Sequence, residues 1–306
     1  MRERTLRDTW DPSDPSVLAW VEQSVGPGTR VSRVTPLPES STAKHLVEVL
    51  RNDGPTLQLL LRRYDDAKRL AEDPWYVPAH EALALRMLAD TAVPAPRLYA
   101  ADLDAKVCDV PALLESWLHG EPAWNPADLD RYLARTAEVL VAIHSVPLSE
   151  KATLPQYAPY SDLSMMKSPE NSSRSELWKC VAEALRSTPP AKKETFIHRD
   201  YHPGNILWNG AGVTGVVDWA TVAIGPPGID LARMRLSLAL HHGRSSADRF
   251  VHAYLAAGGD TSARDPYWDL LDAADFVVDF VPSGEYASEN LARFEEYTEK
   301  VLNELH

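Results

Sequence analysis

The chain has 306 residues, and its 31 basic and 44 acidic side chains give a formal net charge of −13 at pH 7. This balance disfavours a dedicated nucleic-acid-binding protein and docking on anionic membranes, because both depend on Lys and Arg. The chain has few cysteines, no signal-peptide pattern at its start and no run near the ~18 apolar residues of a membrane span, so we expect a cytoplasmic protein without a disulfide scaffold.

The first 118 residues are predicted to form strands with one helix, and the residues after 126 to form mostly helices. Asn52, Asp53 and Gly54 separate two apolar runs, which is a typical hairpin signal. The expected strands are residues 31–36, 45–50, 56–62, 97–101 and 110–118, with a helix at 78–88. A linker at 119–126 and an irregular segment at 157–174 are expected between the helices 127–146, 176–186, 229–242, 248–257, 267–280 and 289–305. Strands followed by helices imply two lobes.

The strongest motif is His198-Arg199-Asp200, with Asn205 five positions after the Asp and Asp218 thirteen positions after Asn205. This is the layout of a kinase catalytic loop followed by a second acidic residue. Phosphoryl transfer needs a carboxylate at the attacking hydroxyl and oxygen ligands for Mg²⁺. Asp200 can take the first role, and Asn205 and Asp218 can hold the metal.

The histidines of this motif allow a different interpretation. His198, Asp200 and His202 could bind a metal ion for hydrolysis, although no H-E-x-x-H arrangement is present and Pro203 after His202 indicates a loop. We expect His198 to support the loop structurally and His202 to cap or pack.

The segment from His198 to Leu207, the triplet Val217-Asp218-Trp219 and the stretch from Gly225 to Ala232 resemble the aminoglycoside phosphotransferase family. The resemblance runs from about Val31 to the end of the chain. It implies an α+β, protein-kinase-like, two-lobed fold, with a β-rich nucleotide-binding lobe over residues 1–118 and a larger helical catalytic and substrate-binding lobe over 119–306. A protein kinase is disfavoured, because Trp219 replaces the Phe-Gly that follows the metal-binding Asp in those enzymes.

The resemblance also implies roles for single residues. Asp200 would be the catalytic base or orient the acceptor hydroxyl, and Asn205 and Asp218 would bind Mg²⁺. Arg62 lies where the family places a basic residue, commonly Lys, against nucleotide phosphates. Glu81 on the following helix would pair with Arg62.

Three further segments follow from the same resemblance. Residues 114–118, with Glu115 and Trp117, resemble the hinge whose backbone binds the adenine edge. Residues 37–45 lie where a turn would cover the phosphates. This turn has no glycine, so Ser41 and its neighbours could supply the donors, and a plain surface turn is the equal alternative; ATP and GTP both remain open. Asp230 would hold the catalytic loop.

The implied activity is transfer of the terminal phosphate of ATP or GTP to a hydroxyl of an aminoglycoside-like or other small molecule, as in antibiotic resistance. Asp272, Asp275 and Asp279 share a helix face and could attract an amine, with Tyr267 and Trp268 offering cation–π contact. A solvated helix surface is the alternative. A kinase for a neutral macrolide or metabolic alcohol, and an inactive nucleotide-binding homologue, are the other functions considered.

Overall fold

The computed structural model describes residues 14–38, 42–148, 153–160, 162–163, 166–169, 171–187, 189–190, 193–210, 212–279 and 287–305. The chain divides into two compact units. Unit 1 comprises Met1–His119 and Gly215–Thr221, and unit 2 comprises Gly120–Thr214 and Val222–His306. Within the described residues, every helix is too short or too polar to span a bilayer.

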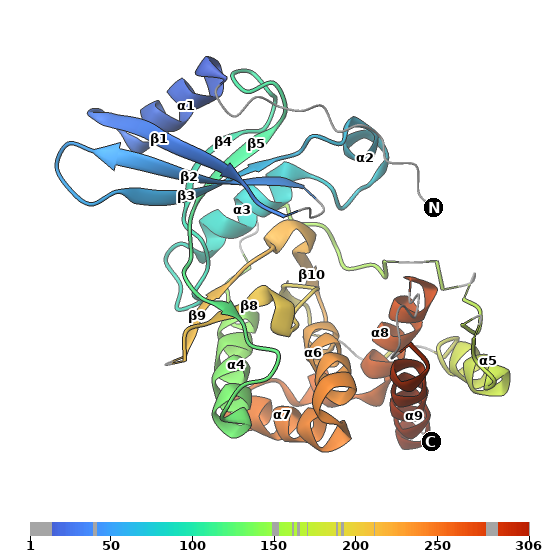
Figure 1. The fold of residues 1–306 in the computed structure, drawn as a ribbon. Coiled ribbons are helices and arrows are strands. Elements are labelled where there is room, and N and C mark those ends of the chain that lie inside the picture. The colour runs from blue at the N-terminus through green and yellow to red at the C-terminus, as the bar shows by residue number, and fades with distance from the viewer. Residues whose placement is uncertain are drawn as a thin grey trace. The chain divides into compact units, whose positions relative to one another are not determined.

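Unit 1 is built on a five-stranded antiparallel sheet of order β1-β2-β3-β5-β4 (Figure 1). Its strands are β1 (Thr29–Pro36), β2 (Ala43–Arg51), β3 (Leu57–Arg63), β4 (Leu98–Asp102) and β5 (Ala112–Ser116). The predicted hairpin joins β2 to β3, which pair antiparallel from Ala43 opposite Arg63 to Val49 opposite Leu57. All five predicted strands are therefore confirmed, within a few residues at their ends.

The two faces of this sheet differ in chemistry because side chains alternate along a strand. One face carries apolar residues such as Val47 and Leu61, which pack with α1 (Pro15–Val25). Lys44, Arg62 and Glu115 occupy register positions of the opposite face. Helix α3 (Pro78–Leu88) contacts β4 and β5, and it begins at a proline as predicted. Helices α1 and α2 (Ala67–Glu72) were not predicted.

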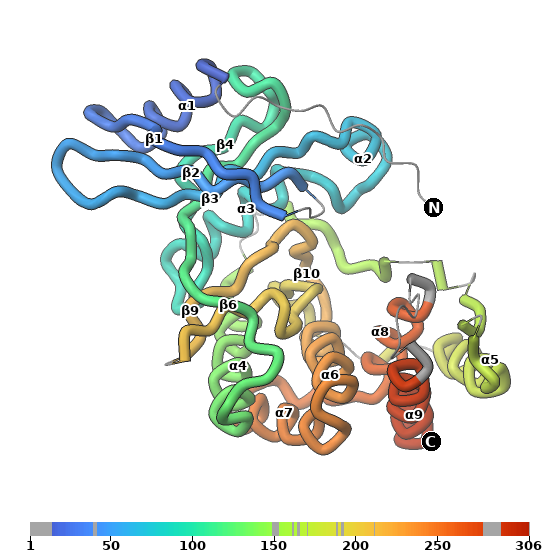
Figure 2. Tube along the Cα trace, viewed as in Figure 1, coloured from blue at the N-terminus to red at the C-terminus, as the bar shows by residue number. Residues whose placement is uncertain are grey.

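Unit 2 is mainly helical, as the sequence predicts (Figure 2). Its helices are α4 (Leu129–His144), α5 (Ser175–Ala184), α6 (Gly228–His242), α7 (Arg244–Ala256), α8 (Pro266–Asp279) and α9 (Ala287–Leu305). Helix α6 contacts α7, α8 and α9, and it is buried on most of its surface. The six predicted helices of this part of the chain are confirmed.

Short strands position the loops of unit 2. Strand β7 (Thr195–Ile197) pairs antiparallel with β10 (Ala223–Gly225), and the catalytic-loop motif begins directly after β7. Strand β6 (Glu121–Pro122) pairs with β8 (Ile206–Trp208), so the predicted linker at 119–126 contains a strand. Strand β9 (Val213–Val216) runs across the boundary between the units. A strand of two or three residues is too short for its alternation to be recognised in the sequence.

Candidate active site

The backbone of the catalytic-loop motif is fixed by Asp230, from the first turn of α6. The N–H groups of His198 and Arg199 donate to the two carboxylate oxygens of Asp230 at 2.8 and 2.6 Å. His144 Nε2 lies 3.2 Å from the same carboxylate. All of these groups are buried. The predicted structural role of Asp230, to hold the loop, is confirmed.

Asp200 is partly exposed and lies among three polar side chains of unit 2. Asn205 Nδ2 donates to the backbone oxygen of Asp200 at 2.9 Å and to Asp200 Oδ2 at 3.1 Å. His202 Nε2 lies 3.5 Å from Oδ2, and Arg233 Nε lies 3.7 Å from Oδ1. Burial raises the pKa of Asp200, but the hydrogen bond and charge of His202 and the charge of Arg233 outweigh burial and lower the pKa to about 2. Asp200 is therefore a carboxylate at neutral pH.

The two histidines of the motif act within the loop. His198 is fully buried, and its Nδ1 accepts a 3.3 Å hydrogen bond from the Asp200 N–H. His202 Nδ1 accepts from the Gly204 N–H at 3.1 Å and so caps the short 3₁₀ helix at Pro203–Asn205. Both match the structural roles expected for them. Among the described residues, no cluster of three or more His, Cys, Asp or Glu side chains is arranged to hold a metal ion, which gives the hydrolytic interpretation no support.

Unit 1 holds a buried charge cluster around Arg62. Arg62 Nε lies 3.3 Å from Glu81 Oε2 and 3.7 Å from Glu115 Oε1, and its Nη1 donates to Asp218 Oδ1 at 2.9 Å. Lys44 Nζ lies 3.5 Å from Asp218 Oδ2. The predicted pairing of Arg62 with Glu81 is confirmed.

The charges of this cluster shift one another's proton affinities. Burial raises the pKa of Glu115 to about 8, and the Glu81 carboxylate adds to this, while the guanidinium of Arg62 opposes it. Burial alone would lower the pKa of Arg62, but the charges of Glu81, Asp218 and Glu115 raise it well above its usual range. Arg62 is therefore permanently charged. Burial and the nearby charge of Arg62 lower the pKa of Lys44.

The predicted hinge, residues 114–118, comprises the end of β5 and the two residues after it. Glu115 directs its side chain to Arg62 rather than to solvent. The N–H of Ser116 donates to Arg97 O at 2.8 Å, and the N–H of Trp117 donates to Gln58 O at 3.1 Å. Sheet contacts thus already occupy both N–H groups. Ser41, in the predicted phosphate-covering turn, lies outside the described residues.

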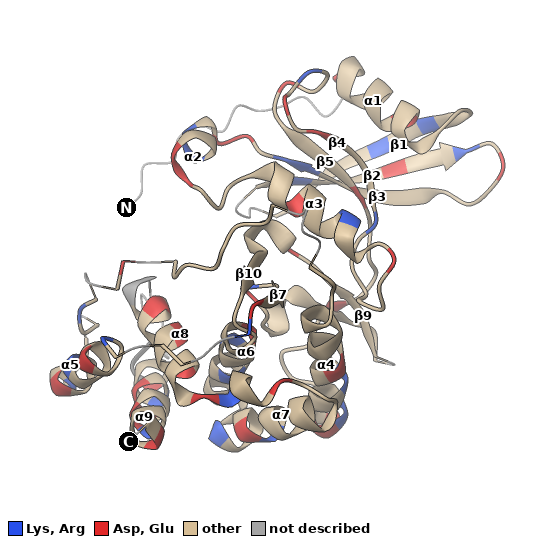
Figure 3. Cartoon of the chain, turned by 180° about the vertical axis from the view of Figure 1, so that it is seen from behind, with Lys and Arg blue, Asp and Glu red and all other residues tan. Residues whose placement is uncertain are grey.

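The described acidic residues that share the predicted face of α8 are buried, and other residues of unit 2 bond to their carboxylates. Figure 3 shows acidic residues along α8, and Asp269, Asp272 and Asp275 are all buried. Asp269 pairs with Arg235, Asp272 Oδ1 lies 3.2 Å from Arg233 Nη2, and Asp275 Oδ2 accepts from the Tyr160 N–H at 2.7 Å. The alternative of a solvated helix surface is wrong, because Asp269, Asp272 and Asp275 are buried and the first two pair with arginines of α6.

The cation–π contact predicted between a bound amine and the rings of Tyr267 and Trp268 is not supported either. Tyr267 and Trp268 are buried and pack edge to face, with ring centroids 5.3 Å apart. Trp268 also packs closely against Gly228 at the start of α6. Packing against α6 therefore leaves little of either ring for a bound amine. The side chain of Asp279 lies outside the described residues.

Sequence reasoning missed two cations, Lys44 and Arg233. Lys44 stands opposite Arg62 in the β2–β3 register, which the predicted hairpin could have revealed. Arg233 follows Asp230 by three positions on α6, so the two share a helix face. That spacing was a signal for a second α6 residue close to the catalytic loop.

Comparisons with known proteins agree with this arrangement. A sequence profile described as the phosphotransferase enzyme family matches residues 47–273. No curated protein matches the chain. A solved structure from Ralstonia eutropha JMP134, assigned to the aminoglycoside phosphotransferases, is similar with a TM-score of 0.62 and 16% identity, over 94% of this chain and 97% of that chain.

Two further solved structures have the same fold. A thermostable mutant of the aminoglycoside phosphotransferase APH(4)-Ia, in a ternary complex with ADP and hygromycin B, has a TM-score of 0.61 and 16% identity, over 94% of this chain and 98% of that chain. The macrolide 2'-phosphotransferase MphH from Brachybacterium faecium has a TM-score of 0.59 and 15% identity, over 94% and 97%. At such identities these similarities show the fold, and they confirm the predicted kinase-like α+β architecture.

Proposed function

Because the chain belongs to the phosphotransferase enzyme family, we propose that it is a small-molecule kinase that transfers the terminal phosphate of ATP or GTP to a hydroxyl group. The observation that supports this best is the environment of Asp200. Its carboxylate is partly exposed and ionised, and it stands in a loop fixed by Asp230. A fixed carboxylate of this kind suits the orientation of an acceptor hydroxyl.

Asp200 acts mainly by orienting the acceptor. Its Oδ atoms accept a hydrogen bond from the acceptor hydroxyl and point the oxygen at the terminal phosphorus. The bond between that oxygen and phosphorus forms, the bond from phosphorus to the bridging oxygen of the nucleotide breaks, and the hydroxyl proton leaves through Asp200. A pKa of about 2 makes Asp200 a weak base, so positioning contributes more than early proton removal.

Asn205 and Asp218 fit the Mg²⁺ that the family implies. The Asn205 Nδ2 is engaged by Asp200, so this side chain offers its Oδ1 to a cation. Asp218 is a partly exposed carboxylate, with 30% of its side chain accessible. Amide and carboxylate oxygens are the ligands that Mg²⁺ prefers. Bound Mg²⁺ would neutralise charge on the nucleotide phosphates.

Unit 1 is the proposed nucleotide-binding lobe, and unit 2 the proposed catalytic and acceptor-binding lobe. The hinge around Glu115 and Trp117 is proposed to bind the base, through backbone groups other than the Ser116 and Trp117 N–H groups. Ser41 and the turn around it are proposed to contact the phosphates.

Two acceptor classes follow. An aminoglycoside-like acceptor is the first candidate, and the similar solved structures include aminoglycoside and macrolide phosphotransferases. A neutral acceptor, such as a macrolide or a metabolic alcohol, is the second. One observation favours the second: Asp272 and Asp275 are already bonded to Arg233 and to the Tyr160 N–H, so they offer little charge to an amine.

An acceptor screen tests the proposal. The protein is incubated with Mg-ATP or Mg-GTP and a panel of aminoglycosides, macrolides and simple alcohols, and phosphorylated products are identified by mass. We expect transfer to at least one hydroxyl compound, and loss of transfer when Mg²⁺ is chelated. Calorimetry that finds no binding of either nucleotide in the presence of Mg²⁺ would refute the kinase function. Phosphorylation of amine-bearing compounds alone would reject the neutral acceptor.

A further inference from the structure

Two cations lie side by side on the face of the unit 1 sheet that α3 covers. Lys44 on β2 is directly opposite Arg62 on β3, and directly opposed residues of antiparallel strands project to the same face. Both cations reach Asp218, Arg62 at 2.9 Å and Lys44 at 3.5 Å. Either one could in principle meet a nucleotide phosphate, so their surroundings decide between them.

Arg62 is saturated by protein carboxylates. Only 2% of its side chain is exposed, and the carboxylates of Glu81 and Glu115, each 2% exposed or less, lie within 3.7 Å of its Nε. With Asp218 added, three carboxylates surround one guanidinium. Moving Arg62 toward a phosphate would leave the Glu81 carboxylate as a buried charge without a counter-ion, which is strongly unfavourable.

Lys44 is placed differently. Its side chain is 18% exposed, and the ion pair it makes among the described residues is the 3.5 Å contact with Asp218. A lysine carries its charge on a flexible four-carbon stem with three rotatable donors, so it can turn from Asp218 to a phosphate without stranding a buried group. The backbone carbonyl of Lys44 accepts a hydrogen bond from the Leu37 N–H at 2.9 Å, which fixes the main chain at this end of β2.

We propose that Lys44, rather than Arg62, supplies the cation of the unit 1 sheet that binds the nucleotide phosphates. Arg62 is then a positioning residue, which holds Glu81, Glu115 and Asp218 in place. This inference rests on the proposed kinase function. It assigns the phosphate contact to β2, one strand away from the basic residue that the sequence indicates.

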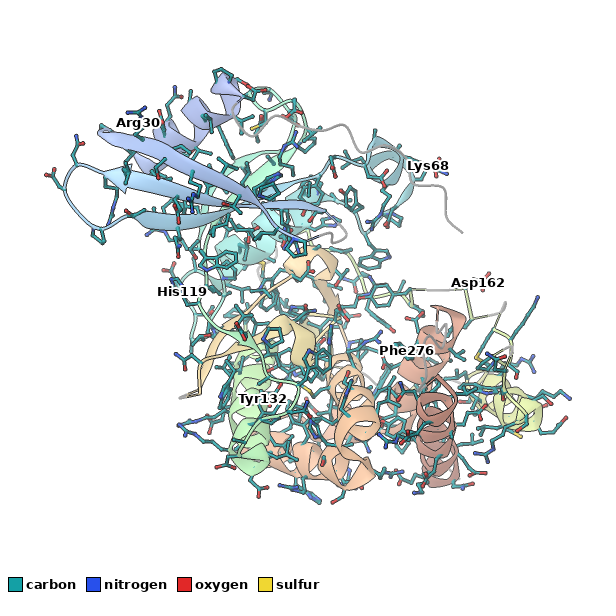
Figure 4. The ribbon with its side chains drawn as sticks, in the orientation of Figure 1. Arg30, Lys68, His119, Tyr132, Asp162 and Phe276 are labelled. Carbon is teal, nitrogen blue, oxygen red and sulfur yellow. The ribbon has the colours of Figure 1, made fainter. Side chains whose placement is uncertain are left out.

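Calorimetric titration in the presence of Mg²⁺ tests the assignment, using ATP and GTP and, as probes without phosphate, adenosine and guanosine. Lys44→Ala is expected to weaken binding of the preferred nucleotide by roughly tenfold or more, since contacts to charged groups contribute most among hydrogen bonds. Binding of the matching nucleoside is expected to stay within about twofold. Lys68→Ala is the matched control, because Lys68 lies on α2 of the same unit with 80% of its side chain exposed (Figure 4).

A double variant examines Arg62 without stranding a charge. Arg62→Gln combined with Glu81→Gln removes the cation together with its nearest buried carboxylate, and we expect it to bind the nucleotide within about threefold of the parent, with a lower melting temperature. Unchanged nucleotide affinity in Lys44→Ala would overturn the assignment, and so would an equal loss of nucleotide and nucleoside binding. If the unaltered protein binds neither ATP nor GTP, the proposed function itself fails.

Discussion

The backbone N–H of Arg199 donates a 2.6 Å hydrogen bond to the buried carboxylate of Asp230. Arg199 has a φ of 72°, in the left-handed region that residues other than glycine seldom adopt. Strain of this kind persists only where the surrounding structure determines it. Asp230 on α6 holds Arg199 in this conformation through the hydrogen bond. The backbone conformation of Arg199 in turn orients Asp200, the next residue.

Replacing Asp230 by Ala should therefore lower both stability and turnover. The N–H groups of His198 and Arg199 would lose their partners inside the protein, at about 1–3 kcal/mol for each buried group. Urea unfolding and steady-state kinetics measure the two effects. Asp130→Ala is the control, because Asp130 is 82% exposed and its ion pair contributes little. A stability equal to that of the control would contradict the role given to Asp230.

Much of this anchoring was predictable from residues close together in the sequence. The motif from His198 to Asn205 indicates the catalytic loop, and the segment containing Asp230 resembles the one that holds this loop in the family. The hairpin signal at Asn52, Asp53 and Gly54 predicts the pairing of β2 with β3. These features depend on the spacing of residues close together in the chain, so a single sequence is enough to predict them.

The remainder depends on which elements pack together. Helical spacing places Asp272 and Asp275 on one face of α8, but it does not reveal that arginines of α6 cover that face. The sequence left two interpretations of this face, an acidic surface that attracts an amine and a solvated helix surface, and neither of them includes the arginines of α6. Lys44 was not predicted as a site residue for a related reason. Its position beside Arg62 follows from the register of β2 and β3, which has to be worked out before the two cations can be compared.

Removal of the Asp200 carboxylate should uncouple binding from chemistry. Asp200→Ala is expected to lower turnover by ~10²-fold or more, because positioned acid–base groups contribute about that much. Nucleotide affinity should stay close to that of the parent, since the cluster around Arg62 is untouched. Steady-state kinetics with any acceptor that the parent phosphorylates measures the turnover, and calorimetry measures the nucleotide affinity. Full turnover in this variant would mean that Asp200 has been given the wrong role.

Glu115 should make the protein less stable as the pH rises. Its pKa is about 8 in the folded protein and near 4.5 when unfolded, so the folded state binds more protons between these values. The free energy of unfolding then falls as the pH rises from about 5 to about 8. Glu115→Gln is expected to flatten this dependence and to be the more stable form near pH 8. Denaturant unfolding at several pH values measures this dependence for the two proteins. Free energies of unfolding that change with pH by the same amount in both would count against the prediction.

Arg233 joins the acidic face of α8 to the catalytic loop. Its Nη2 lies 3.2 Å from Asp272 Oδ1 and its Nε 3.7 Å from Asp200 Oδ1, while its guanidinium carbon lies 5.7 Å from the ring centroid of Phe276, which is labelled in Figure 4. Burial raises the pKa of Asp272 to about 7, although the charge of Arg233 opposes the rise. Asp272 thus depends on Arg233 to remain ionised.

A double-mutant cycle measures that dependence. Arg233→Met alone should cost about 3–5 kcal/mol of unfolding free energy near pH 8, because it leaves a buried carboxylate unpaired. Adding Asp272→Asn removes that carboxylate, so the double variant should be more stable than Arg233→Met. The loss of unfolding free energy caused by Arg233→Met should also be smaller near pH 5, where Asp272 can take up a proton and become neutral. Because the pKa of Asp272 is raised in the folded protein, the folded state binds this proton more tightly than the unfolded state, and the resulting stabilisation is lost as the pH rises. Additive single effects that do not change with pH would show that the two residues are not coupled.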